Sequence, residues 1–255
     1  MTLRIDLNCD LGEDVLVNRL PVELLIMPFI SSANVACGRH AGNLASMHQT
    51  LQLARKHHVA VGVHPSYDDR LNFGRMSVKM TKAGLKDLLK AQILDLLKIA
   101  INEGVVIQHL KPHGALYNDA MIQQETADAI AETVAEILPH AHVFGLPESC
   151  MQNACKKTGV AFAAEAFADR AYDADGRLVA RNKEGSLIHH TTEVIERCLL
   201  MVLENRIVSI DGKNIFFKPD TICLHGDGPN APALSKALRE ALEEHHILVK
   251  PYAAI

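Results

Sequence analysis

The sequence predicts a single α/β domain, a (β/α) barrel with about seven parallel strands. Short apolar runs alternate with longer helix-periodic segments along all 255 residues, with no linker, repeat or low-complexity stretch between them. This alternation implies parallel strands joined by right-handed helical crossovers. Polar residues suited to chemistry follow almost every strand. A barrel gathers all of its strand ends around one mouth, whereas an open sheet uses mainly one switch point, so the closed barrel is favoured over residues 1–255.

The strands are predicted from short apolar runs, the first of which shows β-type alternation. Seven runs are clear, and an eighth at the end of the chain is marginal. In chain order they cover residues 3–8, 29–36, 59–63, 105–110, 142–146, 160–164, 221–224 and 247–249.

Helices are predicted between these strands, where apolar residues recur at spacings of three and four. The patterns cover residues 44–54, 85–97, 130–137, 194–202 and 234–242. Gly104 is a natural stop for the second of these helices. Asn230 is expected to cap the last helix, with Pro232 in its first turn.

Two Asp-Gly pairs predict hairpin turns. The first, Asp175-Gly176, follows a strand end and is expected to form a flap over the barrel mouth. The second, Asp211-Gly212, precedes a strand, so we expect it at the opposite end of the barrel.

The composition excludes several classes of function. The net charge of −4 provides no basic field for nucleic acid, and no apolar run is long enough to span a bilayer. The amino terminus lacks the apolar stretch of a signal peptide. Six scattered cysteines without a C-x-x-C pair suit reduced thiols, so a cytoplasmic protein is expected.

The first candidate site residues lie at the end of the first strand. Period-2 alternation places Asp6, Asn8 and Asp10 on one face of that strand. Carboxylates that point into a barrel mouth can coordinate a metal, hold a substrate amine or act as a base. The alternative is a polar layer that only closes the barrel.

Two later strand ends carry histidines. His40 lies between Gly38 and Gly42, in the kind of tight loop that lets backbone N–H groups approach a ligand. His64 opens a long polar loop typical of lids and binding elements. Arg75, in the same loop, is a candidate clamp for a carboxylate or a phosphate.

The remaining candidates follow the later strands. Lys111 arrives with His113 and Tyr117 directly after a buried strand, where a lysine is desolvated unless it faces an anion or a carbonyl. This placement makes Lys111 a candidate electrophile or clamp. The other polar residues at strand ends are Glu165, Asp169, Arg170, His225 and Asp227.

Six ordered motifs carry a resemblance to a known family. They are D-L-N-C-D-L-G-E, A-C-G-x-H-A-G, H-P-S-Y, K-P-H-G-A-L-Y, E-x-F-A-D-R-x-Y and H-G-D, spread over nearly the whole chain. In this order they resemble the LamB/YcsF family. The resemblance implies a seven-stranded barrel akin to the glycoside hydrolase/deacetylase barrels. It also implies a role as the A subunit of the prokaryotic 5-oxoprolinase, beside subunits B and C.

The family reaction implied here couples hydrolysis of the cyclic amide 5-oxoproline to hydrolysis of ATP. Our hypothesis gives Asp10 and His113 the roles of general base and acid. Lys111, Arg170 and Arg75 would neutralise the phosphate or the substrate carboxylate. His40 and His64 would orient water or substrate. No G-x-x-x-x-G-K-[ST] sequence occurs, so the nucleotide must be held differently or by partner subunits. The residues expected to bind substrate are Asp6, Asn8, Arg75, Tyr117, Glu165, Asp169, Arg170, His225 and Asp227.

Two alternatives remain open at this point. Asp10, His64 and His113 have the composition of a carboxylate-plus-two-histidine metal site, so a metal-dependent amide hydrolase or deacetylase is one. The other is a non-catalytic subunit that binds a lactam while a partner does the chemistry. Assembly of the chain into a homo-oligomer is compatible with either.

Overall fold

The fold is a closed parallel barrel surrounded by helices. The computed structural model describes residues 3–13, 22–226 and 230–252. Seven strands follow one another around the barrel, and the last pairs with the first to close it. These strands are β1 (Arg4–Leu11), β2 (Ser32–Ala36), β3 (Ala60–His64), β4 (Ile107–Leu110), β5 (His142–Gly145), β6 (Ala161–Phe167) and β9 (Thr221–His225). The predicted fold class and all seven clear strand predictions are confirmed.

The marginal eighth strand also exists, but it lies outside the closed ring. β10 (Leu248–Val249) pairs in parallel with the first two residues of β1. From Asp6 onward the same side of β1 pairs with β9 instead, beginning at Thr221. The pairing of β1 with β9 therefore closes the barrel, and β10 extends the sheet only at the N-terminal end of β1.

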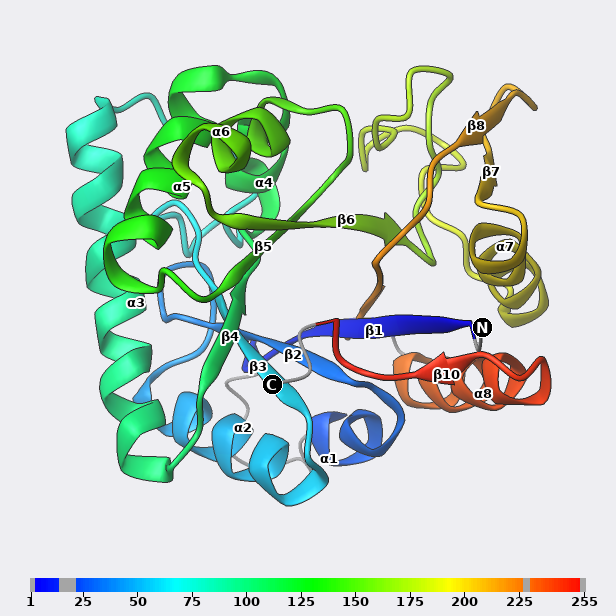
Figure 1. Ribbon diagram of the computed structural model, residues 1–255, viewed down its shortest axis with the longest axis horizontal. Coiled ribbons are helices and arrows are strands. Elements are labelled where there is room, and N and C mark those ends of the chain that lie inside the picture. The colour runs from blue at the N-terminus through cyan, green and yellow to red at the C-terminus, as the bar shows by residue number, and fades with distance from the viewer. Residues whose placement is uncertain (1–2, 14–21, 227–229, 253–255) are drawn as a thin grey trace.

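Helices pack around the outside of the barrel, as Figure 1 shows. Every helix predicted from the sequence is present, and four short segments were not predicted: α1, η1, α4 and α6. The helical segments are α1 (Val22–Ile26), η1 (Met27–Phe29), α2 (Leu44–His57), α3 (Lys82–Glu103), α4 (Gly114–Ile122), α5 (Gln124–Ile137), α6 (Cys150–Thr158), α7 (Thr191–Leu203) and α8 (Ala231–Glu244). No helix in the described ranges is long and apolar enough to cross a membrane.

Local sequence sets where several of these helices begin and end. Asn43 caps α2 in a capping box, in which its side chain accepts from the backbone N–H of Ser46. Gly104 ends α3 in the left-handed conformation (φ 66°), as predicted. Asn230 stands at the predicted cap position of α8, with proline in the first turn, but its side chain makes no capping hydrogen bond.

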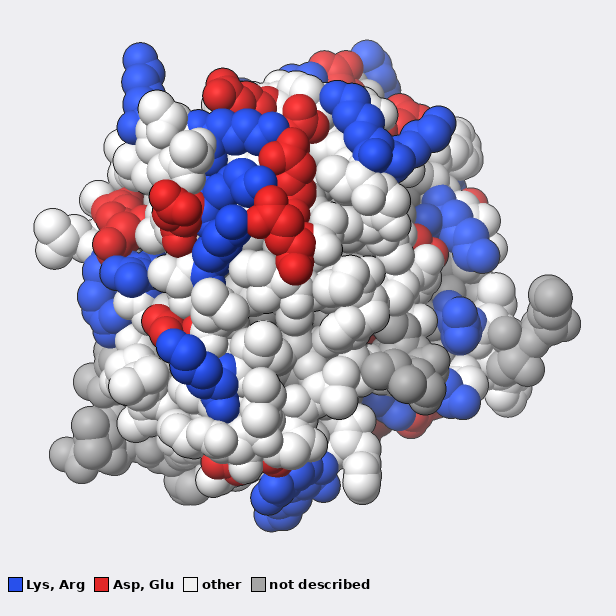
Figure 2. Space-filling model, turned by 60° about the vertical axis from the view of Figure 1, so that its left-hand side comes forward, with Lys and Arg blue, Asp and Glu red and all other residues white. Residues whose placement is uncertain are grey.

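Oppositely charged side chains lie side by side on the outer face of the α3 and α5 helices (Figure 2). Lys82 contacts Glu132 at 2.6 Å, and Lys90 contacts Glu136 at 2.7 Å. These groups are one-third or more exposed, so solvent screens each pair and it contributes little to stability.

The two Asp-Gly hairpins both form, but one lies elsewhere than predicted. The segment 170–188, here called the flap, is held by antiparallel bridges such as Tyr172 with Leu178. The second hairpin pairs β7 (Arg206–Val208) with β8 (Asn214–Phe216). Its turn packs against the flap, because the N–H of Ile210 donates to the carbonyl of Tyr172 at 2.8 Å. The expectation that it lies at the opposite end of the barrel was wrong, because the hairpin lies beside the flap and the chain then returns to the barrel as β9 (Figure 1).

The interior of the barrel is polar, whereas the apolar core lies between barrel and helices. On β1, Leu7 and Cys9 join that core, and Asp6, Asn8 and Asp10 point inward, as their period-2 spacing predicts. The carboxylate of Asp6 accepts hydrogen bonds from Ser31, Ser32 and Thr221. Burial raises the pKa of Asp6 to about 6.

A chain of hydrogen bonds crosses the middle of the barrel. The Asn8 amide donates to Glu165 at 3.0 Å, and the Asn34 amide donates to Asn8 at 2.7 Å. His109 Nε2 donates to the Asn34 oxygen at 2.7 Å, since an amide oxygen can only accept. The His109 ring fits because Gly62 has no Cβ; a Cβ there would lie 2.1 Å from the ring. Most inward polar atoms in this network are thus satisfied by other strands, whereas Glu165 Oε2 has no hydrogen-bond partner among the described residues.

Candidate active site at the barrel mouth

The carboxyl ends of the strands open into a cavity of about 450 Å³. Asp10 of β1, His64 of β3 and His225 of β9 line it together with Lys111 and His113, which follow β4. The flap supplies the opposite wall. The other lining residues are Arg75, Pro112, Gly114, Ala115, Tyr117, Asn118, Met121, Ile122, Leu146, Phe167, Arg170, Arg177, Leu178, Val179, Ala180 and Arg181.

Lys111 anchors the centre of the site. Its ammonium group lies 3.0 Å from Asp10 Oδ1, 3.1 Å from Glu165 Oε1 and 2.8 Å from Cys223 Sγ, and the residue is 2% exposed. Burial alone would lower the pKa of Lys111, but Asp10, Cys223 and Glu165 raise it well above its usual value. Lys111 therefore remains a cation and cannot serve as a neutral base.

Asp10 is held as an anion. Burial alone would raise its pKa, but His64, when its ring is protonated, and Lys111 hold it well below the usual range. Its second carboxylate oxygen lies 3.4 Å from His64 Nε2. The amide of Asn34 also donates to Asp10, at 2.8 Å. Asp10 can thus orient a proton donor or a cation in the cavity without first losing a proton.

His225 and Asp169 form a second acid–base pair on the cavity wall. His225 Nδ1 lies 2.8 Å and 3.0 Å from the two carboxylate oxygens of Asp169. Burial alone would raise the pKa of Asp169, but the contact with His225 lowers it. An ionised carboxylate can only accept, so Nδ1 carries the proton and Nε2 is the ring atom available for proton transfer.

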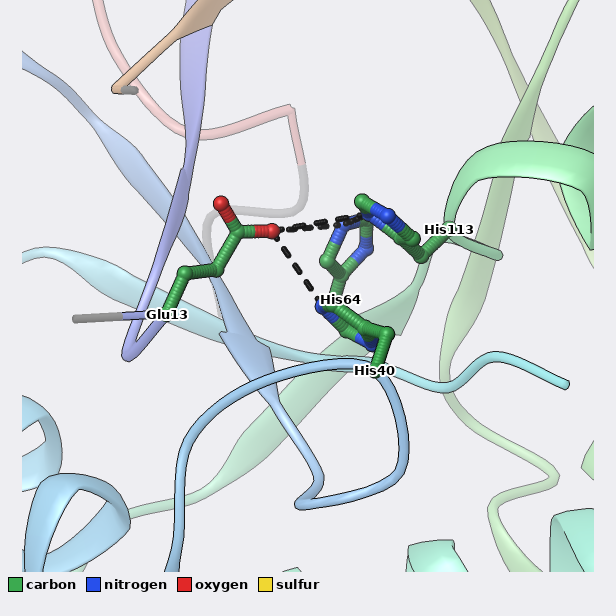
Figure 3. Close-up of side chains that lie close together, drawn as sticks. All are labelled: Glu13, His40, His64 and His113. Carbon is green, nitrogen blue, oxygen red and sulfur yellow. Dashed lines mark hydrogen bonds and ion pairs between the residues drawn. The ribbon is translucent and has the colours of Figure 1, made fainter. Parts of the chain in front are cut away.

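Three histidines and a glutamate gather beside this centre (Figure 3). Glu13 Oε1 lies 3.2 Å from His40 Nε2, 3.5 Å from His113 Nδ1 and 4.0 Å from His64 Nε2. Burial lowers the pKa of His40 to about 2 and holds that of His113 well below its usual value. We use the name histidine cluster for Glu13, His40, His64 and His113.

The flap carries basic side chains over the mouth. Arg170 donates to the carbonyl of Val179 at 2.6 Å, which ties the two strands of the flap together. Tyr172 accepts a hydrogen bond from the N–H of Phe167 at 2.8 Å and so fixes the flap to the end of β6. Arg177 and Arg181 line the cavity from the same segment.

The family model of the LamB/YcsF family matches residues 5–255, which is almost the entire chain. The chain belongs to the LamB/YcsF family. A protein of Campylobacter jejuni named as the A subunit of 5-oxoprolinase is 43% identical over 246 residues, 96% of each chain. A Clostridium beijerinckii protein with the same name is 42% identical over 97% of each chain. The crystal structure of a lactam utilization protein from Thermus thermophilus superposes with a TM-score of 0.91 at 37% identity, covering 97% of this chain and 99% of that one.

Most residues singled out from the sequence of this LamB/YcsF protein converge at the mouth. Those that line the cavity are Asp10, His64, Arg75, Lys111, His113, Tyr117, Arg170 and His225. Glu165, Asp169 and His40 lie directly behind this layer and contact Lys111, His225 and Glu13, respectively.

Three other candidates are placed differently. Asp6 and Asn8 point inward but lie deeper in the barrel, where protein side chains satisfy them, and neither is among the residues that line the cavity. Asp6 therefore matches the alternative of a polar layer that closes the barrel. Asp227 lies outside the described residues.

Sequence reasoning gave no site role to three residues that lie in or beside the cavity of this LamB/YcsF protein: Glu13, Arg177 and Arg181. Glu13 ends the first motif, but it follows the turn at Gly12 (φ 77°), so strand periodicity does not give its direction. Arg177 and Arg181 follow the first Asp-Gly turn, which already predicted a flap. Basic residues within a predicted flap were the available signal.

Proposed function

We propose that this LamB/YcsF protein is the A subunit of a 5-oxoprolinase that opens 5-oxo-L-proline to L-glutamate with consumption of ATP. Relatives with this subunit name, 39% to 44% identical over almost their whole length, support it. The observation that carries the proposal is the cavity of about 450 Å³, in which a permanent cation, an ionised carboxylate and an Asp–His pair surround one space. Such a volume is in the range of small-molecule sites.

The basic wall of the cavity suits an anionic substrate. 5-Oxoproline carries one carboxylate, and a transferred phosphoryl group adds further negative charge. Arg75, Arg177 and Arg181 line the cavity, and guanidinium groups bind carboxylates and phosphates in bidentate geometry. We assign these arginines to binding, whereas Arg170 is engaged in tying the flap together.

The inner wall provides the groups for ring opening. Lys111 neutralises negative charge on the phosphoryl group that the lactam oxygen receives. His225, oriented by Asp169, transfers protons to and from water and the leaving amine. Tyr117 adds a neutral donor, because burial, and then the Glu165 carboxylate, raise the pKa of its phenol well above the usual value. This assignment moves the main proton-transfer role from His113 to His225.

The proposed reaction proceeds in balanced steps. The lactam oxygen takes the γ-phosphoryl group of ATP, and ADP leaves. One water adds to the activated carbon, the ring C–N bond breaks, and a proton goes to the amine. A second water then releases phosphate and leaves L-glutamate.

Partner subunits complete the proposal. Since no P-loop sequence occurs, we assign most of the nucleotide binding to subunits B and C. An ATP-consuming enzyme belongs in the cytoplasm, where the six cysteines, all free in this structure, stay reduced.

The test is coupled release of glutamate and phosphate from 5-oxoproline and ATP, measured for this chain with and without subunits B and C. We expect coupled release only in the mixture. His225→Gln should lower kcat by about 100-fold, since a positioned proton-transfer group contributes about 10²–10⁴-fold. His245→Gln, at the far end of α8, is the matched control and should leave kcat unchanged.

Three outcomes would contradict the proposal. Full activity of the chain alone would remove the need for partners. If the complex is shown to form but the mixture releases neither glutamate nor phosphate, 5-oxoproline is excluded as the substrate. Unchanged kcat in His225→Gln, with substrate bound, would indicate a lactam-binding subunit whose chemistry lies elsewhere.

A further inference from the structure

The histidine cluster brings together side chains from four separate segments. Glu13 follows β1, His40 lies in the β2–α2 loop, His64 ends β3, and His113 follows β4. One ligand atom from each lies within 4.8 Å of the others. His40 and His64 are each 1% exposed, so their ring atoms have been removed from bulk water. The burial of three imidazoles around one point is costly unless each ring nitrogen has a partner, and His40 Nδ1 has no hydrogen-bond partner among the described residues.

Backbone carbonyls determine which ring atoms of two histidines carry protons. His64 Nδ1 lies 2.7 Å from the carbonyl oxygen of Lys111, and His113 Nε2 lies 2.9 Å from that of Phe73. A carbonyl oxygen only accepts, so both of these ring atoms donate. In the neutral rings, the lone pairs are therefore on His64 Nε2 and His113 Nδ1, which are 2.9 Å apart. Two lone pairs at this distance repel each other unless a cation lies against both.

We propose that Glu13, His40, His64 and His113 bind one divalent transition-metal ion of the zinc class. With bonds of about 2.0–2.1 Å, the ligand atoms of a tetrahedral zinc site lie about 3.3 Å apart. Four of the distances within the cluster are 2.9 Å, 3.2 Å, 3.5 Å and 4.0 Å. Three of them lie within about 0.4 Å of the tetrahedral value, and the fourth, from Glu13 to His64, is longer. The His40 ring is stacked on the His113 ring, with planes 4° apart, so the His40 ring must turn for its lone pair to point at the same ion.

The donor set selects among metals. Three imidazole nitrogens and one carboxylate oxygen suit zinc and its neighbours, whereas magnesium and calcium prefer oxygen ligands alone. The carbonyls that hold His64 and His113 act as the outer hydrogen-bond partners that metal-binding histidines commonly have. The site therefore has both its ligands and the groups that orient them.

A glycine in the loop between β3 and α3 lets the chain pack closely over the histidine cluster. Gly74 has φ 65°, and a Cβ at this position would lie 2.9 Å from His40 Cβ and 3.0 Å from His113 Cδ2. The loop thus packs directly onto the rings. Phe73 adds edge-on contacts to His40 and His113, at centroid distances of 5.5 Å and 5.2 Å. This enclosure shields the proposed ion from bulk water on that side.

The cluster adjoins the cavity, since His64 and His113 also line it. Binding of the ion is independent of the proposed function, but any use of it in ring opening rests on that function. The chief competing explanation is a single proton shared by His64 and His113. Such a proton relieves the same lone-pair repulsion without a metal, and the experiment separates the two.

The experiment measures metal content rather than activity. The full chain, purified without chelator, is analysed by elemental mass spectrometry, and the stripped chain is titrated with Zn²⁺, Co²⁺ and Mg²⁺ separately. We expect about one zinc per chain, no saturable Mg²⁺ binding at the same concentrations, and the visible absorption of four-coordinate cobalt on Co²⁺ addition. Zinc should also raise the melting temperature of the stripped chain.

Variants locate the ion. His40→Gln and Glu13→Gln should each weaken zinc binding by at least about 100-fold, the upper end of the loss seen when only an outer partner is removed. His48→Gln is the matched control, because His48 also pairs with a glutamate, Glu103, at 3.1 Å, but on α2. Circular dichroism establishes that each variant is folded, and Glu13→Gln preserves side-chain shape if His40→Gln does not fold.

Two results would overturn the inference. A folded wild-type chain that takes up no zinc and shows only six-coordinate cobalt would favour the shared proton. Equal loss of zinc in His48→Gln would place the ion elsewhere. Because neither readout uses 5-oxoproline, failure here is distinct from failure of the proposed function.

Discussion

Replacement of Lys111 by methionine would leave two buried carboxylates without the ammonium group that they share. Asp10 and Glu165 each lie within 3.1 Å of Lys111 Nζ. Methionine retains most of the apolar stem, so the change removes mainly the charge. The substitution therefore tests whether the ion cluster, and not packing alone, stabilises the barrel interior.

The magnitude follows from the burial of these groups. Breaking a buried ion pair by removing one partner costs about 3–5 kcal/mol, because the remaining charge is uncompensated. The side chains of Lys111 and Glu165 are 2% and 0% exposed, so solvent screening does not reduce this figure. An exposed pair contributes less than about 1 kcal/mol. Lys90→Met, which breaks the exposed pair with Glu136, is therefore the matched control.

The assay is urea denaturation of the wild type and of each variant. We expect Lys111→Met to lose about 3–5 kcal/mol near neutral pH and Lys90→Met to lose much less, because its pair is exposed to solvent. A buried carboxylate that has lost its cation takes up a proton more readily, so the loss should shrink as the pH falls from about 8 to about 5. Glu165→Gln in the Lys111→Met background should recover at least about 1 kcal/mol.

The reasoning would be refuted if Lys111→Met were no more destabilising than Lys90→Met. It would also fail if Glu165→Gln made the double variant less stable than Lys111→Met alone. Either result would mean that hydration or rearrangement compensates the carboxylates.

Three further predictions concern the barrel interior and the flap. Gly62→Ala should cost about 3 kcal/mol or more in a thermal or urea melt, because its Cβ would lie 2.1 Å from the His109 ring. The pKa of Asp6 is raised from 3.8 to about 6 in the folded state, so the folded protein binds this proton more tightly than the unfolded chain does. The free energy of unfolding should therefore fall by about 3 kcal/mol as the pH rises through this range. Asp6→Asn should remove this slope, and persistence of the slope would assign it to another group. Arg181→Ala should raise KM for 5-oxoproline or ATP about tenfold in the reconstituted enzyme with unchanged stability; an unchanged KM would exclude Arg181 from binding.

Much of the fold could be read from the sequence because its signals are local. Apolar periodicity gave the seven barrel strands, and Gly104 marked a helix end by its tolerance of positive φ. The short helices α1, α4 and α6 were missed because five to nine residues cover too few turns for a periodic pattern. The β7–β8 hairpin was recognised from Asp-Gly, but no local signal showed that it would pack on the flap.

The sequence by itself determined which residues face inward and which strand ends carry chemistry. Alternation placed Asp6, Asn8 and Asp10 on one face, because successive side chains of a strand point to opposite sides. Only the tertiary structure decided their depth, with Asp10 at the cavity and Asp6 sealed beneath it. The depth of a side chain in the barrel depends on the shift in register between neighbouring strands. This shift is set by closure of the whole ring of strands. The contacts of Lys111 with Asp10 and of Glu13 with His113 join segments about a hundred residues apart, so closure of the barrel, and no local pattern, brings them together.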